Sequence, residues 1–253
     1  MIEHTDDPLI FNAAVNRQKY ASHDLATDYC PFCHLEDLTD ILARKEDMIW
    51  LKNKYPTIEK SLMTVLIESE EHLGDISTNA KEKNRAIFAF AFDCWTSLLD
   101  DSKYRSVLMF KNYGPRSGGT LRHPHMQIIA LEEVDGYAEI STENFEGLEV
   151  VPGLVLSERP VMGFVEFNIE IEQRNEVDQL ADLTGTVTHY LTTTFMDGRC
   201  DSYNLFFYKL GERLICKVVP RFVTSPYFIG YKIPQVQHRA RLETIAKELR
   251  ECL

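Results

Sequence analysis

The two halves of the sequence follow the same order of segments, and this repeat constrains the fold more than any other feature. Residues 83–114 run from a charged helix start through an apolar helix, a loop with aspartate and an aromatic-rich strand to a glycine, and residues 176–211 follow the same order. An internal repeat of this kind indicates a duplicated structural unit. We therefore predict an α+β fold with two tandem units, residues 1–135 and 136–253, each made of an antiparallel sheet and a packed helix.

Hydrophobic periodicity places the elements within each half. Short apolar runs bounded by turn residues predict strands, and apolar residues three or four positions apart predict helices. The predicted strands are residues 48–51, 64–67, 107–110, 123–131, 161–171, 203–208 and 214–219. The predicted helices are residues 79–100, a second with an apolar face from Leu180 to Leu191, and a last one that opens near Pro234.

Composition and charge exclude several classes of protein. The net charge of −12 argues against a long nucleic-acid groove, because binding a phosphate backbone needs clustered lysine and arginine. No stretch approaches the roughly 18 apolar residues of a membrane span, and the acidic start lacks the features of a signal peptide. We expect a cytoplasmic protein without nucleic-acid or membrane partners, whose six cysteines serve a metal site and incidental thiols rather than disulfides.

The segment from Asn112 to Gln127 concentrates residues that can bind and react with phosphate. Alternate side chains of a strand share a face, so His123, His125 and Gln127 are predicted to face one site. Pro124 places the segment at a sheet edge or a strand start, and the glycines ahead of it let backbone N–H groups approach a phosphate. The alternative is a pair of histidines on an apolar strand that core hydrogen bonds satisfy.

An asparagine, a glycine-rich loop, a serine or threonine and then His-Pro-His-x-Gln follow here in the order typical of galactose-1-phosphate uridylyltransferases. The resemblance extends to Asn53–Pro56 and Cys30–Cys33, and more weakly to Tyr227–Tyr231. The chain thus resembles this family of the histidine-triad superfamily over most of its length, most closely before residue 131. The resemblance implies two tandem histidine-triad-like units, of which the first is catalytic and the second degenerate.

By this resemblance His125 is the nucleophile, which attacks the α-phosphorus of a nucleotide sugar, expels a sugar 1-phosphate and passes the nucleotide to a second phosphate. An imidazole suits this relay, because its reference pKa of about 6.5 keeps it substantially neutral at pH 7. Gln127 stands where histidine-triad hydrolases carry a third histidine. An amide can hydrogen-bond a phosphoryl oxygen but cannot donate a proton near neutral pH, so transfer to phosphate is favoured over hydrolysis.

Cys30 and Cys33 have the spacing that lets two thiolates bind one tetrahedral zinc ion, which needs two more ligands. The resemblance supplies two histidines for this role, His72 and His123. Two nearby histidines are substitutes for the first of them, namely His23 and His34. Such a zinc site would brace the N-terminal segment against the catalytic strand. A redox Cys-x-x-Cys is the alternative, although no thioredoxin-like strand and helix surround the pair.

The same resemblance predicts five contacts to phosphate or nucleotide, from Arg17, Asn53, Asn112, Ser117 and Thr120. Arg17 is equally well a solvated surface residue, and Asn53 is also suited to shaping its own turn. Two further arginines flank the glycine-rich loop and could add local cations, namely Arg116 and Arg122.

The sequence departs from the family pattern in its second half. The family often carries a second metal site on the strand that here spans residues 214–220, where Ile215 and Lys217 replace the histidines, so we expect no second metal. The family's glutamate after Gly-Tyr contacts sugar hydroxyls, whereas Lys232 follows Gly230 and Tyr231 here. Because a cation does not accept hydrogen bonds from a hexose, we expect an anionic acceptor and leave the sugar open.

The leading hypothesis is a nucleotidyltransferase that moves a nucleoside monophosphate from a UDP- or ADP-sugar to a phosphorylated acceptor through a nucleotidyl-histidine. One alternative is a nucleotide-sugar or dinucleoside polyphosphate phosphorylase or hydrolase, and another is a non-catalytic, zinc-braced nucleotide-binding protein. The expected partners are nucleotide sugars and sugar phosphates or related small anions, and a homodimer is left open.

Overall fold

The computed structural model describes residues 8–15, 29–222, 233 and 235–253. The protein is a mixed α/β structure whose strands pair in antiparallel fashion and whose helices are few. The chain divides into two compact units. Unit 1 comprises Met1–Leu73, Phe90–Met109 and His123–Glu139, and unit 2 comprises Gly74–Ala89, Phe110–Arg122 and Ile140–Leu253.

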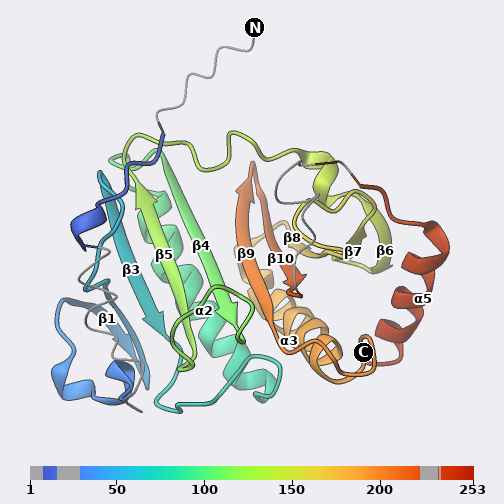
Figure 1. Ribbon diagram of the computed structural model, residues 1–253, viewed down its shortest axis with the longest axis horizontal. Coiled ribbons are helices and arrows are strands. Elements are labelled where there is room, and N and C mark those ends of the chain that lie inside the picture. Colours follow the sequence, from blue (N-terminus) through green and yellow to red (C-terminus); the bar gives the residue numbers. More distant parts are fainter. Residues whose placement is uncertain (1–7, 16–28, 223–232, 234) are drawn as a thin grey trace, which may run out of the picture. The chain divides into compact units, whose positions relative to one another are not determined.

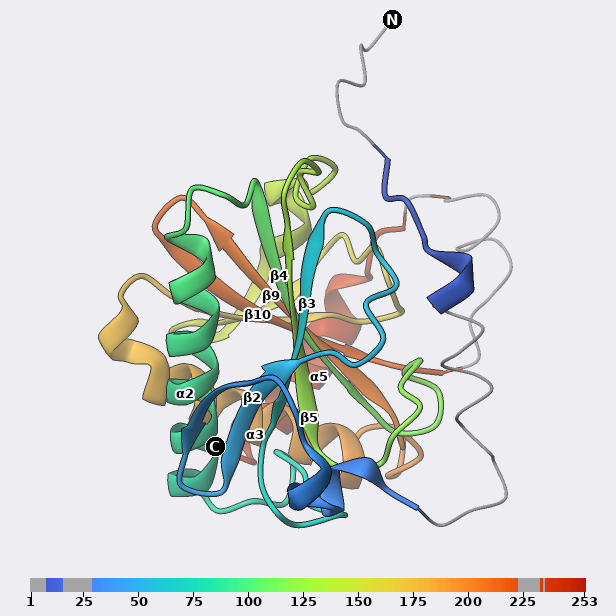
Figure 2. The ribbon, with the colours of Figure 1, turned by 90° about the vertical axis from the view of Figure 1, so that its left-hand side faces the viewer.

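Unit 1 is built on an antiparallel sheet with the strand order β1-β2-β3-β5 (Figure 1 and Figure 2). The strands are β1 Ile41–Lys45, β2 Met48–Lys52, β3 Ser61–Ile67 and β5 His125–Leu131, and β4 Ser106–Tyr113 contributes Ser106–Met109 to this unit. Two short helical turns precede the first strand, η1 Pro31–Cys33 and η2 Leu35–Asp37. The second half of helix α2 Lys81–Leu99 also belongs here, and Trp95 Nε1 donates a hydrogen bond to the Val107 carbonyl oxygen at 3.0 Å.

The register between β3 and β5 decides which side chains share a face of the sheet. Ile67 is paired with His125, and Val65 is paired with Gln127. Because directly paired residues project to the same side, His125 and Gln127 lie on the face that carries Val65 and Ile67. The apolar cluster of that face consists of Ile49, Leu51, Val65 and Ile67, with Phe32, Leu35, Leu38 and Ile41 packed against it. The catalytic candidates therefore stand on a rigid, buried support.

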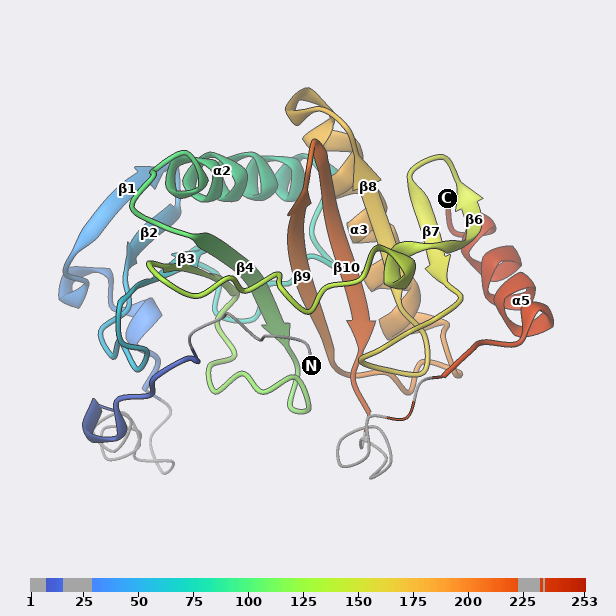
Figure 3. The same ribbon diagram turned by 90° about the horizontal axis from the view of Figure 1, so that it is seen from above.

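Unit 2 contains a second antiparallel arrangement with the strand order β9-β10-β8-β7-β6. The strands are β6 Gly147–Val151, β7 Leu154–Ser157, β8 Phe167–Ile171, β9 Tyr203–Leu210 and β10 Arg213–Pro220, and Phe110–Tyr113 of β4 belongs here too. Helix α3 Val177–Thr193 packs against β8 and β10, and α5 Arg239–Arg250 packs beside β6 (Figure 3). The remaining turns are η3 Thr142–Phe145 and η4 Arg174–Glu176.

Most of the predicted elements match observed ones, but four predicted starts are wrong. The strand predicted from residue 64 begins at Ser61. The strand of the His-Pro-His segment begins at His125 rather than at residue 123, because Pro124 has no N–H to donate to a ladder. The strand predicted from residue 161 begins at Phe167, and the last helix begins at Arg239, after extended backbone at His238. Pro234 lies outside the described residues.

Two short pieces of sheet were not predicted, namely β1 and the β6–β7 hairpin. Their apolar runs are only two or three residues long, because β1 ends in Arg44 and Lys45 and β6 contains Gly147 and Glu149. Pairing with a neighbouring strand stabilises them instead. The duplication with its boundary after residue 135 stays a prediction. Among the described residues, no helix combines the length and apolarity needed to cross a membrane.

Candidate functional site

The Cys30–Cys33 segment forms a tight turn that is fixed to the sheet of unit 1. Pro31 opens η1, and the Cys33 N–H donates to the Cys30 carbonyl oxygen at 3.1 Å. A proline suits the first position of a helical turn, because its missing N–H is not needed there. Phe32, between the two cysteines, packs against the apolar cluster of β2 and β3. The turn thus presents both thiols from a fixed backbone.

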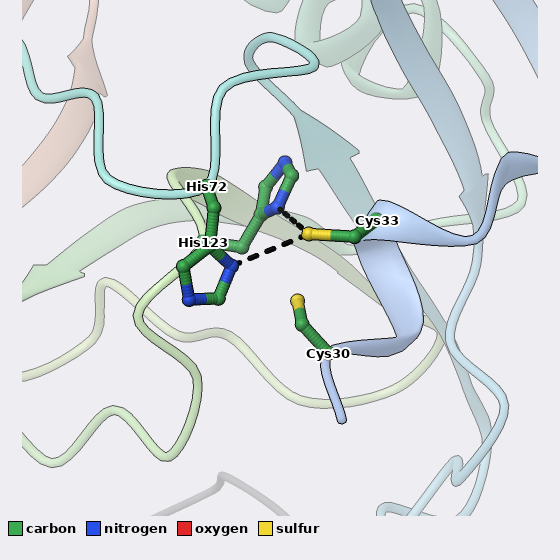
Figure 4. A group of neighbouring side chains, drawn as sticks. All are labelled: Cys30, Cys33, His72 and His123. Atoms are coloured by element: carbon green, nitrogen blue, oxygen red, sulfur yellow. Dashed lines mark hydrogen bonds between the residues drawn. The ribbon is translucent and has the colours of Figure 1, made fainter. Parts of the chain in front are cut away.

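The four residues predicted as metal ligands lie together in unit 1 (Figure 4). One ligand atom from each of Cys30, Cys33, His72 and His123 lies within 4.8 Å of all the others. Cys33 Sγ is 3.3 Å from His72 Nδ1 and 3.5 Å from His123 Nδ1. Two thiols and two imidazoles form a donor set that suits a tetrahedral transition-metal ion, so this group could bind a metal.

The environment of His123 selects one tautomer of its ring. His123 is buried, and its Nε2 lies 2.8 Å from the carbonyl oxygen of Ser69, which can only accept a hydrogen bond. The proton therefore sits on Nε2, and Nδ1, the atom that faces Cys33, carries the lone pair. A backbone carbonyl that orients a histidine in this way is a common outer contact of metal ligands. Ser69 was not predicted from the sequence, because a backbone acceptor leaves no residue-type signal.

The thiol of Cys33 has an environment that favours the neutral form unless a cation is near. Desolvation and the adjacent Cys30 raise the pKa of Cys33 above its ordinary value. Two neighbouring thiolates repel each other, whereas a divalent cation between them stabilises both. A divalent cation at this pair would therefore favour the thiolate forms that metal binding requires.

His125 opens strand β5 and is held in a defined orientation. Its side chain is only 8% exposed, and its Nδ1 lies 2.8 Å from the carbonyl oxygen of His123. The carbonyl oxygen can only accept, so Nδ1 carries the proton and Nε2 keeps the lone pair that a nucleophile needs. The Phe32 ring meets both histidines edge-on, with centroid distances of 5.8 Å to His123 and 5.4 Å to His125. Phe32 is a further contact that the sequence analysis did not identify.

Gln127 lies two residues further along β5, where its side chain is partly buried and shares the face of His125.

Asn53 lies at the end of β2, and its Oδ1 accepts the Tyr55 N–H at 2.9 Å. This bond is the turn-shaping role weighed for Asn53 from the sequence. Arg17, Lys232 and His23 lie outside the described residues.

The glycine-rich loop after β4 belongs to unit 2 and is anchored there. Gly114 has φ +83°, and a Cβ atom at this position would lie 2.1 Å from the Asp201 carbonyl oxygen, so no other residue fits. Ser117 is buried, and its Oγ donates to the Gly114 carbonyl oxygen at 2.7 Å. Thr120 is exposed. Asn112 Oδ1 accepts a hydrogen bond from Asn204 Nδ2 at 2.6 Å.

The two loop arginines differ in their environments. Arg116 pairs with both carboxylate oxygens of Asp201, and its guanidinium and the Ser202 hydroxyl hold the pKa of Asp201 below its usual range. Its charge is therefore compensated within the protein, which weakens the expectation that Arg116 serves as a cation for a ligand. Arg122 is exposed at the end of the loop.

Lys217 has a buried partner that the sequence analysis missed. Its ammonium group donates to Glu166 Oε2 at 2.6 Å and to the Asn144 carbonyl oxygen at 2.7 Å, and it lies 4.5 Å from the centre of the Phe145 ring. Glu166 also accepts the Val161 N–H, at 2.7 Å. Burial lowers the pKa of Lys217, and the Glu166 carboxylate opposes that effect. No local pattern links residues 166 and 217, because the pairing of β8 and β10 brings them together.

Comparison with known structures shows the fold. A uridylyltransferase mutant is 15% identical with a TM-score of 0.67, and the match covers 89% of this chain and 93% of that chain. An ADP-glucose phosphorylase from Arabidopsis thaliana, solved with bound ADP-glucose, is 15% identical with a TM-score of 0.65 over 96% of this chain and 98% of that chain. The protein therefore shares the fold of these two proteins.

Closer similarity identifies the family. Residues 11–134 match the DUF4931 N-terminal domain and residues 137–253 match the DUF4931 C-terminal domain, each described as a domain of unknown function. A DUF4931 family protein from Bacillus cereus is 43% identical with a TM-score of 0.76, over 84% of this chain and 99% of that chain. A comparison with curated proteins found no match. Together, the two family models and the Bacillus cereus structure show that this chain belongs to the DUF4931 family.

Proposed function

We propose that this protein is a nucleotidyltransferase that moves a nucleoside monophosphate from a UDP- or ADP-sugar to a phosphorylated acceptor through a covalent intermediate on His125. One observation carries the proposal. His125 Nδ1 donates its proton to the His123 carbonyl oxygen at 2.8 Å, so the lone pair lies on Nε2 of a ring that cannot change its tautomer without losing this bond.

The transfer proceeds in two displacements. In the first, His125 Nε2 forms an N–P bond to the α-phosphorus, and the P–O bond to the sugar 1-phosphate breaks, with the electron pair leaving on its oxygen. In the second, a phosphate oxygen of the acceptor attacks the same phosphorus, and the N–P bond breaks. The sugar 1-phosphate departs without an added proton, because a phosphate monoester has a second pKa of about 6. In the second step the electron pair of the N–P bond returns to His125 Nε2, and the imidazole departs as a neutral ring because Nδ1 keeps its proton. A proton donor at position 127 is therefore not required.

Gln127 would hydrogen-bond a phosphoryl oxygen from the same face of β5. We assign phosphate or nucleotide contacts to Arg17, Asn53, Asn112, Ser117 and Thr120, in line with the order of these residues around the His-Pro-His segment. The order Gly230-Tyr231-Lys232 favours an anionic acceptor. Inorganic phosphate would make the enzyme a phosphorylase, which the fold shared with an ADP-glucose phosphorylase supports as a second candidate.

Cys30, Cys33, His72 and His123 would hold a zinc ion, and the thiol and imidazole donors fit that metal. When bound, zinc supplies structural stabilisation of about 10 to 16 kcal/mol in comparable small sites. His123 then acts through its backbone, since its carbonyl oxygen accepts the His125 proton. A stable backbone at residue 123 would keep the His125 ring in the orientation for attack.

Two tandem histidine-triad-like units, divided after residue 135, complete the proposal. The first would supply the nucleophile and the metal ligands, and the second would be a degenerate copy. The matches to separate N-terminal and C-terminal domains support a division of the chain in this region.

The test is incubation of the protein with UDP- and ADP-sugars that carry a labelled α-phosphorus. We expect label on the protein that is released by acid and retained in base, as for a phosphoramidate. His125→Ala should abolish it. His189→Ala is the matched control, because His189 also contacts a backbone carbonyl through Nδ1, at 3.0 Å from Ser77 O, but is exposed on α3. Absence of label on the wild type with every nucleotide sugar, or equal label on His125→Ala, would contradict the proposal.

A further inference from the structure

One buried amide joins the end of strand β4 to the glycine-rich loop that follows it. Asn204 is 3% exposed on strand β9, and its Nδ2 donates to Asn112 Oδ1 at 2.6 Å and to the Ser117 carbonyl oxygen at 3.0 Å. The proposed function assigns contacts with phosphate to both Asn112 and Ser117. Asn204 itself lies 92 positions from Asn112 in the sequence, and no motif pointed to it.

The chemistry of these contacts fixes the orientation of both amides. The Ser117 carbonyl oxygen can only accept, so the Asn204 atom that faces it must be the NH₂ group. The same NH₂ group faces Asn112, so the Asn112 atom that meets it must be the carbonyl oxygen Oδ1. Either amide flipped alone would place two donors or two acceptors against each other. The orientation therefore follows from hydrogen-bond complementarity.

As a consequence, the NH₂ group of Asn112 points away from Asn204. Among the described residues the structure records no hydrogen bond from Asn112 Nδ2, although Oδ1 is engaged and the side chain is only partly buried. An NH₂ group offers two N–H donors and no acceptor, which matches the oxygen of a phosphate and opposes a cation. The backbone around Asn112 is also restrained, because residues 201–204 make further contacts with the loop that follows β4. The Arg116 N–H donates to Ser202 Oγ at 3.1 Å, and Gly114 lies against Asp201.

We infer that Asn204 is a positioning residue, which presents the Asn112 NH₂ group to a phosphate oxygen of the nucleotide. The inference rests on the proposed function, because it names the residue that aligns one of the assigned phosphate contacts. Asn204 does not touch the ligand. Asn204 acts through Asn112 instead, because it keeps the Asn112 amide oriented with its NH₂ group toward the anion.

Asn204→Asp tests this role with almost no change in volume. A carboxylate only accepts, so it loses the bond to the Ser117 carbonyl oxygen and draws the Asn112 NH₂ group toward itself. Asn112 Oδ1 then faces the phosphate. Hydrogen bonds to charged groups contribute more to binding free energy than hydrogen bonds between neutral groups. We therefore expect the Kd for UDP and ADP to rise about 10- to 100-fold. Asn112→Asp should have a similar effect, since it keeps an acceptor for Asn204 but presents a second oxygen to the ligand.

Uridine and adenosine, which carry no phosphate, separate a positioning role from a structural one. We expect Asn204→Asp to bind these nucleosides as the wild type does in an NMR titration below its unfolding temperature, which a buried carboxylate facing the Ser117 carbonyl oxygen should lower. Asn79→Asp is the matched control, because Asn79 Nδ2 donates to Asn84 Oδ1 at 3.1 Å in another asparagine pair of unit 2. This control should leave the Kd for UDP and ADP unchanged.

Three outcomes overturn the inference. If folded Asn204→Asp binds UDP and ADP with the Kd of the wild type, Asn204 has no positioning role, and the proposed function is unaffected. An equal loss of nucleoside and nucleotide binding would show that Asn204 only supports the loop structure. A wild type that binds neither UDP nor ADP would refute the proposed function and, with it, this inference.

Discussion

His125 Nδ1 lies 2.8 Å from the carbonyl oxygen of His123, and the same His123 turns its own Nδ1 toward Cys33 at 3.5 Å. One residue therefore joins the candidate metal group to the candidate nucleophile, through its side chain on one side and its backbone on the other. A change at the candidate metal ligands should alter the orientation of the His125 ring without any direct contact between metal and substrate. This arrangement would give a metal held by the candidate ligands a positioning role rather than a chemical one.

The first prediction concerns loss of a metal ligand. Cys33→Ser should reduce zinc bound per chain well below that of the wild type, lower the thermal unfolding temperature and slow labelling of His125, because the backbone at His123 is no longer braced. Zinc content is measured by mass spectrometry of the metal, and labelling by the rate of nucleotide incorporation. Cys252→Ser, which changes an exposed cysteine near the end of α5, should alter none of the three. Full zinc content in Cys33→Ser would remove Cys33 from the ligand set.

The second prediction concerns the fate of the covalent intermediate. Gln127→His places a group that can carry protons on the face of β5 that holds His125, so water should discharge the labelled protein faster. General acid–base catalysis typically contributes about 100- to 10,000-fold, and we expect at least a tenfold effect from an unoptimised site. The measurement is the half-life of isolated nucleotidyl-protein in buffer. Gln127→Leu, which can neither donate nor accept, should not shorten this half-life, and an unchanged half-life in Gln127→His would argue against the role of position 127.

The candidate metal ligands Cys30 and Cys33 and the candidate nucleophile could be proposed from the sequence because part of their pattern is local. A two-residue spacing marks Cys30 and Cys33, and alternation along a strand marks His125 and Gln127. Even there, the strand began two residues later than predicted, because Pro124 interrupts the ladder. The structure adds what spacing does not contain, namely the tautomers that backbone acceptors impose on the two histidines.

The contacts of Asn204 and Lys217 in the second half could not be predicted from residue spacing. Asn204 reaches Asn112 and Ser117, and Lys217 reaches Glu166, only once the register of β8, β9 and β10 is known. The sequence analysis identified Lys217 as a replacement for a histidine but gave no reason for a lysine in a buried strand. A carboxylate that is 0% exposed and lies 2.6 Å away supplies that reason.

The third prediction follows from this buried ion pair. Removing one partner leaves a buried charge, which typically costs about 3–5 kcal/mol, so Lys217→Met and Glu166→Gln should each lower the free energy of unfolding by about that amount. The double substitution should cost less than the sum, because neither charge then remains. Urea denaturation of the four proteins measures the coupling. Arg159→Met breaks an exposed pair with Glu143, 61% exposed on each side, and should cost less than about 1 kcal/mol. Additive single effects at Lys217 and Glu166 would show that the pair does not interact.

The fourth prediction concerns pH, through the thiol of Cys216 on β10. The side chain is fully buried, and burial raises its pKa from 9.0 to about 12. Below pH 9 both the folded and the unfolded states hold the proton, so the stabilising difference is fully present. Between pH 9 and 12 the unfolded state releases the proton first, so the free energy of unfolding should fall by up to about 1.4 kcal/mol per pH unit from this group.

Cys216→Val removes the titrating thiol at similar volume, so its stability should decline less steeply than that of the wild type in urea denaturation at pH 8 to 10.5. Cys252→Val, at an exposed position, should follow the wild type, because it leaves the buried Cys216 thiol in place. Parallel curves for Cys216→Val and the wild type would mean that the thiol ionises as readily in the folded protein as in the unfolded chain, and that β10 is not closed to water at this position.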